Sequence, residues 1–217
     1  MERRNSTTKT FQKRSRNNLS ENRVIGVMGL SHGVGVTHLC IMMANYLVSG
    51  CGQKTAVLEW AETEPTDRES ALQRLEAVCM GKARGKKPYR VLGVDYYCAS
   101  GAGELASCIG SNYERIILDF GCIGQENQRE LLRCDQKLIV ASLSEWQIEA
   151  FWQFYGEKEN AECKSWSYLV AFGSEETRKE MNRRLKLSFL RIPLSIDAFA
   201  INREMMTWFY EILTRCR

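Results

Sequence analysis

The sequence predicts an α/β protein whose core is a doubly wound, mostly parallel β-sheet between two layers of helices. Short apolar runs alternate along the chain with longer amphipathic patterns, which is the element order of this fold class. Several of the runs are nearly continuous in Val, Ile and Leu, as expected for parallel strands that are covered on both faces. The first run leads into a glycine-rich loop and then into an apolar segment of helical length, which predicts a strand–loop–helix unit.

The expected strands are the apolar runs, taken in chain order. They are 24–30 (VIGVMGL), 55–60 (TAVLEW), 90–97 (RVLGVDYY), 115–120 (RIILDF), 137–142 (KLIVAS), 168–172 (YLVAF) and 190–193 (LRIP). The chain contains only three prolines, no visible internal repeat and no linker composition that would divide it. Residues 23–217 are therefore expected to form a single domain.

Two of the expected helices carry clear apolar stripes. In the segment SEWQIEAFWQFY, four residues fall at i, i+3, i+4 and i+7 and so share one helical face: Ile148, Phe151, Trp152 and Tyr155. The same spacing recurs near the C-terminus at Met205, Trp208, Phe209 and Ile212. Both stripes predict packing against the sheet, and the additional aromatic residues Trp146 and Tyr210 leave an interface open as an alternative.

The N-terminal segment is strongly basic. Residues 1–23 hold seven cations and two acidic residues, a net charge of +5, whereas the whole chain carries +4. The segment has almost no large apolar residues, so residues 1–22 are expected to form a disordered basic tail. Its role stays open between a solubilising terminus and electrostatic attachment to anionic lipid or to nucleic acid. Nucleic acid is the less expected partner, because Phe11 is the only aromatic residue available for base stacking.

Composition indicates the cellular compartment. No run approaches the roughly 20 apolar residues of a membrane span, and the N-terminus has no apolar signal core. The nine cysteines are scattered, and their odd number excludes a fully paired internal framework. The expected localisation is cytoplasmic, with peripheral attachment to the inner face of the membrane as an option through the basic tail.

The stretch GLSHGVGVTH, Gly29 to His38, has the layout of a phosphate-binding loop without its lysine. In such loops backbone N–H groups converge on phosphates at a helix N-terminus, a lysine neutralises the outer phosphates and a Ser or Thr hydroxyl holds Mg²⁺. Thr37 stands at the metal-binding position, and the lysine position before it is Val36. No Lys or Arg occurs between Val24 and Gln53, so a shifted alignment recovers no cation.

Four segments together carry a family resemblance: GVGVTH with the uncharged segment after it, KTAVLEW, YERIILDFG and CDQKLIVASLSEWQIEAF. In this order they resemble the ParA/MinD (SIMIBI-class) P-loop ATPases, over roughly residues 24–215. Within that class the chain looks most similar to atypical pilus-assembly members of the TadZ/CpaE type. The resemblance implies a P-loop NTPase-like, Rossmann-like three-layer fold, and a degenerate Walker A loop.

The resemblance assigns roles to individual residues. The nucleotide phosphates would be held by the loop and the start of its helix, Gly33, Val34, Gly35, Val36, Thr37 and His38. Thr37 and Asp119 match the two groups that hold Mg²⁺, Asp119 through water. The family's catalytic lysine is replaced by Val36 and its signature lysine by Ser31. Ala171 stands where the family commonly has an asparagine near the adenine.

Candidates for catalysis are few. Asp119 and Glu59 are the carboxylates that could act on a reacting phosphate, and neither assignment is firm from the sequence alone. Glu59 ends an apolar run, so it fits a switch residue and a hydrogen-bonded strand-end carboxylate equally well. His32, in the loop itself, is the candidate for a replacement cation, whereas His38 enters the helix and is expected to face neighbouring packing.

The function that the sequence favours is a localisation or assembly factor for a pilus or secretion apparatus. It would bind protein partners of a membrane-associated machine, and a second copy of itself. Removing one preorganised charge contact typically slows such a reaction by a factor on the order of 10²–10³, so the loss of both lysines predicts little or no hydrolysis. The alternative is an ATP-binding switch with slow turnover and nucleotide-dependent dimerisation. ATP or ADP with Mg²⁺ is the expected cofactor in both cases, unless the loop is a structural relic.

Overall fold

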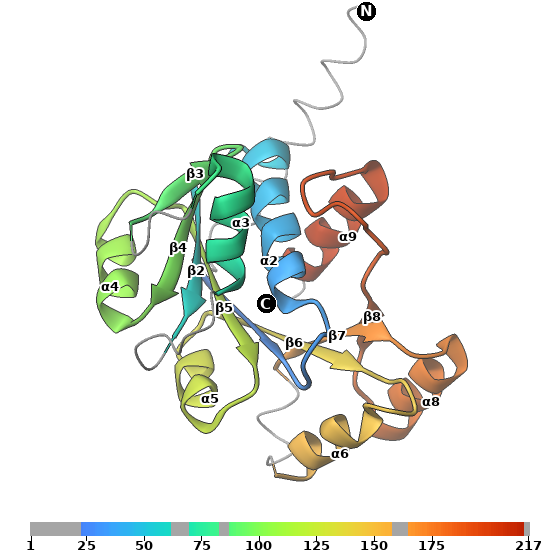
Figure 1. The fold of residues 1–217 in the computed structure, drawn as a ribbon. Helices are drawn as coiled ribbons and strands as arrows, with labels where there is room; N and C mark the ends of the chain where they lie inside the picture. The colour runs from blue at the N-terminus through green and yellow to red at the C-terminus, as the bar shows by residue number, and fades with distance from the viewer. Residues whose placement is uncertain (1–22, 62–69, 83–86, 158–164, 215–217) are drawn as a thin grey trace, which may run out of the picture.

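The computed structural model describes residues 23–61, 70–82, 87–157 and 165–214, in which strands and helices alternate (Figure 1). The strands are β1 (Val24–Gly29), β2 (Thr55–Trp60), β3 (Tyr89–Val91), β4 (Val94–Ser100), β5 (Arg115–Cys122), β6 (Gln136–Ser142), β7 (Ser167–Phe172) and β8 (Phe189–Arg191). The helices are α2 (Val36–Asn45), α3 (Ala71–Met80), α4 (Ala102–Gly110), α5 (Gln125–Leu132), α6 (Ile148–Glu157), α8 (Glu175–Leu185) and α9 (Arg203–Thr214). A π-helical turn, η1 (Tyr46–Gly50), continues α2. The predicted basic tail, residues 1–22, lies outside the described residues.

The strands form one sheet with the order β3-β4-β2-β5-β1-β6-β7-β8. Neighbouring strands are parallel from β4 to β8, and β3 alone of the described strands runs antiparallel to its neighbour. β1, which leads into the glycine-rich loop, lies between β5 and β6 at the centre. This arrangement confirms the predicted fold class of a mostly parallel α/β sheet.

The prediction of a single strand over 90–97 is wrong. The chain forms a hairpin there, with Tyr89 opposite Tyr96 and Val91 opposite Val94. Leu92 and Gly93 make the turn, and both have positive φ angles, 49° and 85°. A two-residue turn in which both residues have positive φ matches the twist of the paired strands. Gly93, a glycine inside an apolar run, is the sequence signal for this turn.

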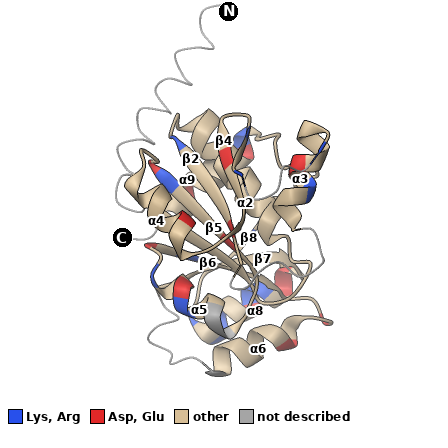
Figure 2. Ribbon diagram, turned by 60° about the vertical axis from the view of Figure 1, so that its left-hand side comes forward, with Lys and Arg blue, Asp and Glu red and all other residues tan. Residues whose placement is uncertain are grey.

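The helices cover both faces of the sheet (Figure 1). On one face α2, η1, α3 and α9 pack over a core that includes Val57, Ile117 and Leu138. On the other face α4, α5, α6 and α8 pack over a second core that includes Leu118, Ile139 and Val170. Charged residues, blue and red in Figure 2, lie mostly on the helices and at strand ends, as expected when both sheet faces are buried.

Both predicted apolar stripes pack against the sheet. In α6, Phe151 is fully buried, and Ile148, Trp152 and Tyr155 pack around it. In α9, Met205, Phe209 and Ile212 are buried. Trp146 just before α6 is 90% exposed, so it contributes to surface and not to either core.

Among the described helices, none combines the length and the apolar character that crossing a membrane requires.

Candidate functional site

The glycine-rich loop connects the end of β1 to the start of α2 at the carboxyl edge of the sheet. Gly33 and Gly35 have φ angles of 79° and 86°, a conformation that other residues adopt only with strain. A Cβ atom added at either glycine would meet no heavy atom within 4 Å. The front of the loop is therefore open, and its backbone can be approached closely from that side.

Val36, at the position where the resemblance implies a lysine, has a side chain that belongs to the core. It is 7% exposed, and Val34 is 3% exposed. A Cβ atom on Gly29 would lie 2.8 Å from Cγ2 of each of these valines, so both side chains fold back over the end of β1. The loop thus presents backbone and glycines on its open side and buries its apolar side chains behind them.

Asp119 lies in β5 beneath the loop, and its environment favours a cation. Its side chain is 1% exposed, Oδ1 accepts a hydrogen bond from the Gly121 amide at 3.0 Å, and Oδ2 makes no hydrogen bond of normal geometry. Burial raises the pKa of Asp119 to about 6 and the Glu59 carboxylate adds to the rise, while the Thr37 hydroxyl and the Gly121 amide oppose it. A buried carboxylate with a free lone pair next to a threonine hydroxyl is a suitable donor set for Mg²⁺. Thr37 and Asp119, far apart in sequence, are brought together as the resemblance implies.

Glu59 is engaged in a structural contact. It is the register partner of Asp119 on the adjacent strand, and its two carboxylate oxygens accept hydrogen bonds from the first amides of α3. Ala71 N lies 2.9 Å from Oε1 and Leu72 N lies 3.2 Å from Oε2. The two amides are among those that a helix N-terminus leaves unpaired, and a carboxylate also suits the positive end of the helix dipole. Of the two roles open for Glu59, the geometry favours the hydrogen-bonded strand-end carboxylate.

Replacing Glu59 by alanine should destabilise the fold. The change removes both acceptors from the α3 N-terminus, so we expect the free energy of unfolding to fall by about 1 kcal/mol. Glu59→Gln retains one acceptor oxygen and should lose less. Chemical denaturation of the three proteins measures the difference. Unchanged stability in Glu59→Ala would return this residue to the list of catalytic candidates.

A pocket of about 640 Å³ lies beside the loop, on the α2 and α9 side of the sheet. This volume is within the range of small-molecule sites. Its walls come from the loop, α2, the end of β7 and the segment that joins β8 to α9. The lining residues are Val34, Gly35, His38, Leu39, Met42, Ala171, Phe172, Arg191, Ile192, Pro193, Leu194, Ser195 and Glu204.

The two histidines differ from expectation. His38 lines the pocket, and its Nε2 atom is buried without a hydrogen-bond partner, so the side chain has an unused polar atom there. His32 is exposed and does not line the pocket, although its carbonyl accepts a hydrogen bond from Gln147 Nε2 at 3.3 Å. His38 is the third residue of α2, and it lines the pocket together with Leu39 and Met42 of the same helix. The expectation that His38 faces packing alone is therefore corrected.

Arg191 is the cation that lines this pocket. Its guanidinium donates to the carbonyl oxygens of Ala171, at 3.5 Å, and Gly173. These bonds tie β8 to the end of β7 and hold the guanidinium at the wall of the pocket. Sequence reasoning missed Arg191 and the rest of the β8–α9 wall, because that segment contains no motif.

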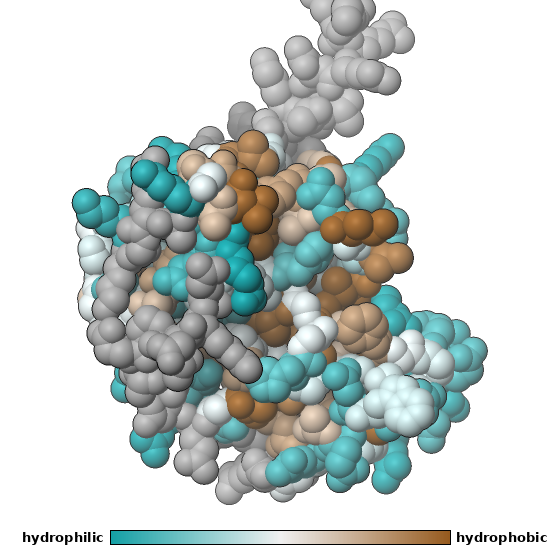
Figure 3. All heavy atoms as spheres, in the orientation of Figure 1, coloured by the Kyte–Doolittle hydropathy of each residue, from teal (hydrophilic) through white to brown (hydrophobic). Residues whose placement is uncertain are grey.

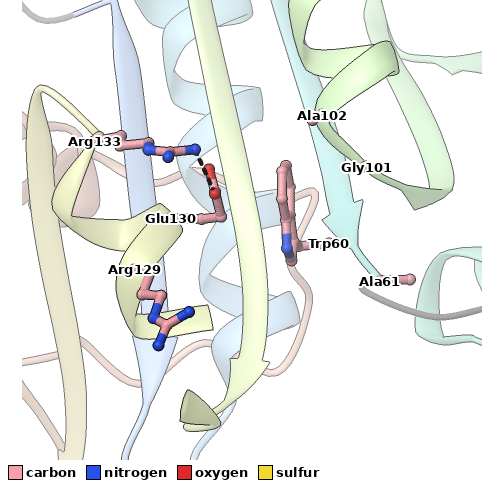
Figure 4. Close-up of a pocket in the computed structure, with 7 residues that line it drawn as sticks. All are labelled: Trp60, Ala61, Gly101, Ala102, Arg129, Glu130 and Arg133. Carbon is pink, nitrogen blue, oxygen red and sulfur yellow. Dashed lines mark hydrogen bonds and ion pairs between the residues drawn. The ribbon is translucent and has the colours of Figure 1, made fainter. Parts of the chain in front are cut away.

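A second pocket, of about 400 Å³, lies at the end of β2 between α4 and α5, on the opposite side of the sheet. Figure 4 shows Trp60 facing Glu130 of α5 and Arg133 just after that helix, which form an ion pair of 2.6 Å, with Arg129 below them. Ala61, Gly101 and Ala102 complete the lining. None of the predicted site residues lines this pocket, so it is separate from the phosphate-loop site.

Comparison with known proteins identifies the fold. No protein-family model and no curated protein matches the sequence. Among solved structures, a ParA-family ATPase from Chlorobium tepidum TLS is 16% identical, with 88% of this chain and 92% of that chain covered and a TM-score of 0.54. A plasmid partition protein from Borrelia burgdorferi B31 bound to AMPPNP is 14% identical, with coverages of 90% and 97% and a TM-score of 0.55. The MinC:MinD cell division protein complex of Aquifex aeolicus is matched at 18% identity, with coverages of 80% and 82% and a TM-score of 0.53.

These similarities extend over most of both chains at low sequence identity. The protein has the fold of the ParA and MinD ATPases.

Proposed function

We propose that this protein is a ParA/MinD-like factor that binds Mg-nucleotide weakly, hydrolyses it slowly or not at all, and acts in localisation or assembly. One observation carries the proposal: a buried valine stands where the resemblance implies the catalytic lysine, while the loop backbone stays open and a buried carboxylate lies beneath it. Val36 is buried against Gly29, yet Gly33 and Gly35 keep their open conformations and Asp119 keeps an unpartnered oxygen.

The residues present fit a Mg-nucleotide. The backbone amides from Gly33 to Thr37 at the start of α2 would hold the phosphates, and the 640 Å³ pocket beside them would take the base and sugar. Thr37 would bind Mg²⁺ directly and Asp119 through water, which would satisfy the free Oδ2 atom. When bound, Mg²⁺ neutralises phosphate charge. His38 would offer its Nε2 atom to the ligand from the wall of the pocket.

Hydrolysis requires more than the site provides. Both family lysines are replaced, by Val36 and Ser31, so no loop cation stabilises charge on the transferred phosphoryl group. Glu59 is the remaining candidate for orienting a water molecule. Both of its carboxylate oxygens already accept hydrogen bonds from the first amides of α3. Weak binding with very slow turnover is the behaviour that these contacts support.

The proposed biological role rests on the resemblance to TadZ/CpaE-type proteins. We propose that the partners are components of a pilus or secretion apparatus at the cytoplasmic face of a bacterial membrane. The structurally similar MinD is part of a complex with MinC, so this fold can support a partner-binding role.

A second candidate, the nucleotide-dependent switch that dimerises, is favoured by one surface feature. Trp146 is 90% exposed beside the loop, and its neighbour Gln147 is hydrogen-bonded to the loop at His32. An aromatic side chain left in solvent next to the phosphate site suits an interface that forms when nucleotide binds.

Measurements of ATP turnover and of molecular mass on one preparation distinguish the non-hydrolysing factor from the dimerising switch. Phosphate release from ATP and light-scattering mass are recorded with and without Mg-ATP. We expect phosphate release at the background rate and an unchanged mass. Steady turnover together with a doubled mass would support the switch and overturn the non-hydrolysing factor.

A further inference from the structure

Charge is strongly polarised along the chain. Residues 1–23 carry +5, and residues 77–94 carry a further +5 from five cations without any acidic residue. The rest of the chain holds 18 of the 30 cations and 24 of the 26 acidic residues, a net charge of −6. Two separate segments thus concentrate positive charge on a protein that is otherwise acidic.

The described parts of both basic segments lie at the same edge of the sheet. Arg23 directly precedes β1, which begins at Val24. β4 is parallel to β2 and follows the β3–β4 turn, so that turn lies where the parallel strands begin. α3 returns from the carboxyl end of β2 to this edge, and its last turn reaches the hairpin at the top of Figure 1. The phosphate loop lies at the opposite, carboxyl edge.

Apolar side chains are exposed among these cations. Val78 and Met80, in the last turn of α3, are 83% and 38% exposed, and Leu92 at the hairpin turn is 62% exposed. Lys82 and Lys87 flank them and are exposed. Figure 3 shows hydrophobic residues at the top of the molecule, over the ends of α2 and α3, and others lower on the same face. These five residues are named the amino-edge surface below.

Folding does not explain Leu92. Its φ angle of 49° is one that Asn or Gly adopts readily and that leucine adopts with strain. Burial does not compensate for the strain, because most of the side chain is in solvent. Neither backbone preference nor burial accounts for a leucine at this turn, and its side chain is available for a contact with another surface.

We propose that the amino-edge surface docks on an anionic lipid bilayer. Lysines near a negatively charged membrane are attracted to it, and aliphatic side chains beside them can enter the region below the headgroups.

Nucleic acid fits less well as the ligand of this surface. The aromatic rings of the hairpin, Tyr89 and Tyr96, are buried and stacked on each other, so they cannot stack on bases. Arg90 is held in an ion pair with Asp95 at 2.6 Å and stabilises the hairpin. Docking in this way leaves the phosphate loop facing away from the membrane.

The test is co-sedimentation of the full chain with phosphatidylcholine vesicles, with and without phosphatidylglycerol. We expect binding only to the anionic vesicles, reversed by salt. Leu92→Asn should lower the partition coefficient about tenfold or more, because it removes the inserting side chain, and should fold well because Asn tolerates the turn conformation. Lys82→Gln and Lys87→Gln should each lower the coefficient about fivefold.

Ile196→Asn is the matched control, because Ile196 is 96% exposed but follows the carboxyl end of β8. This variant should bind vesicles like the wild type. Equal losses in Leu92→Asn and Ile196→Asn, or no loss in Leu92→Asn, would overturn the proposal. The proposal would also be overturned if Lys82→Gln weakened binding to double-stranded DNA and left vesicle binding unchanged. Nucleotide binding is not required for any of these readouts, so the proposed function can fail independently.

Discussion

Replacing Val36 by lysine should tighten the binding of Mg-ATP by about 10- to 100-fold. A hydrogen bond to a charged group contributes about 1.5–3 kcal/mol, and each 1.4 kcal/mol changes affinity about tenfold. Val36 directly precedes Thr37, where the resemblance implies the family's lysine. The long apolar stem of lysine can follow the buried valine while its ammonium group reaches the open front of the loop. Asp119, buried beneath the loop, offers a compensating negative charge.

Val36→Met is the matched control for this prediction. Methionine has a similar length and no charge, so it should alter packing at Gly29 as lysine does without tightening nucleotide binding. Calorimetric titration with Mg-ATP compares the two variants with the wild type. Equal affinity in Val36→Lys and Val36→Met would show that the missing charge does not limit binding.

Asp119→Asn should stabilise the metal-free protein at neutral and alkaline pH, by at most about 3 kcal/mol. Burial raises the pKa of Asp119 from 3.8 to about 6, so the ionised group is less favourable in the folded state than in the unfolded chain. The penalty is absent below pH 4, grows as the pH rises towards 6 and is complete above it. The asparagine side chain keeps an oxygen for the Gly121 amide and carries no charge.

Denaturation in EDTA at several pH values measures this effect. The difference between Asp119→Asn and the wild type should be largest at pH 8 and close to zero near pH 4. Added Mg-nucleotide should reverse the order of stability at pH 8, because only the wild type holds the metal through a carboxylate. A wild type that is more stable than Asp119→Asn in EDTA at pH 8 would mean that Asp119 is already compensated without a cation.

The sequence predicted the sheet better than it predicted the site. Apolar runs of Val, Ile and Leu determine where the buried strands lie, because burial on both faces leaves few alternatives. The exception was 90–97, where the Leu92–Gly93 turn converted one expected strand into a hairpin. The structure of this segment depends on the positive φ angles of the two turn residues, which the apolar pattern does not reveal.

The sequence identified the site residues that belong to a motif with a fixed backbone geometry. It did not identify the roles of residues whose position depends on the packing of other elements. Thr37 and Asp119 converge because β1, which leads into the loop and α2, pairs with β5 in the sheet. The capping role of Glu59 depends on where α3 begins, twelve residues later, which the strand pattern does not reveal. Likewise, the contribution of Arg191 depends on the packing of β8 against β7.

The measurement that tests the central claim most directly is calorimetric titration of the wild-type chain with Mg-ATP and Mg-ADP, repeated on Thr37→Ala and Asp119→Ala. The account predicts measurable binding of both nucleotides by the wild type and its loss in both variants, since these residues hold the metal. Absence of heat and of thermal stabilisation at millimolar nucleotide would contradict it. The loop would then be a structural relic on a protein-binding scaffold.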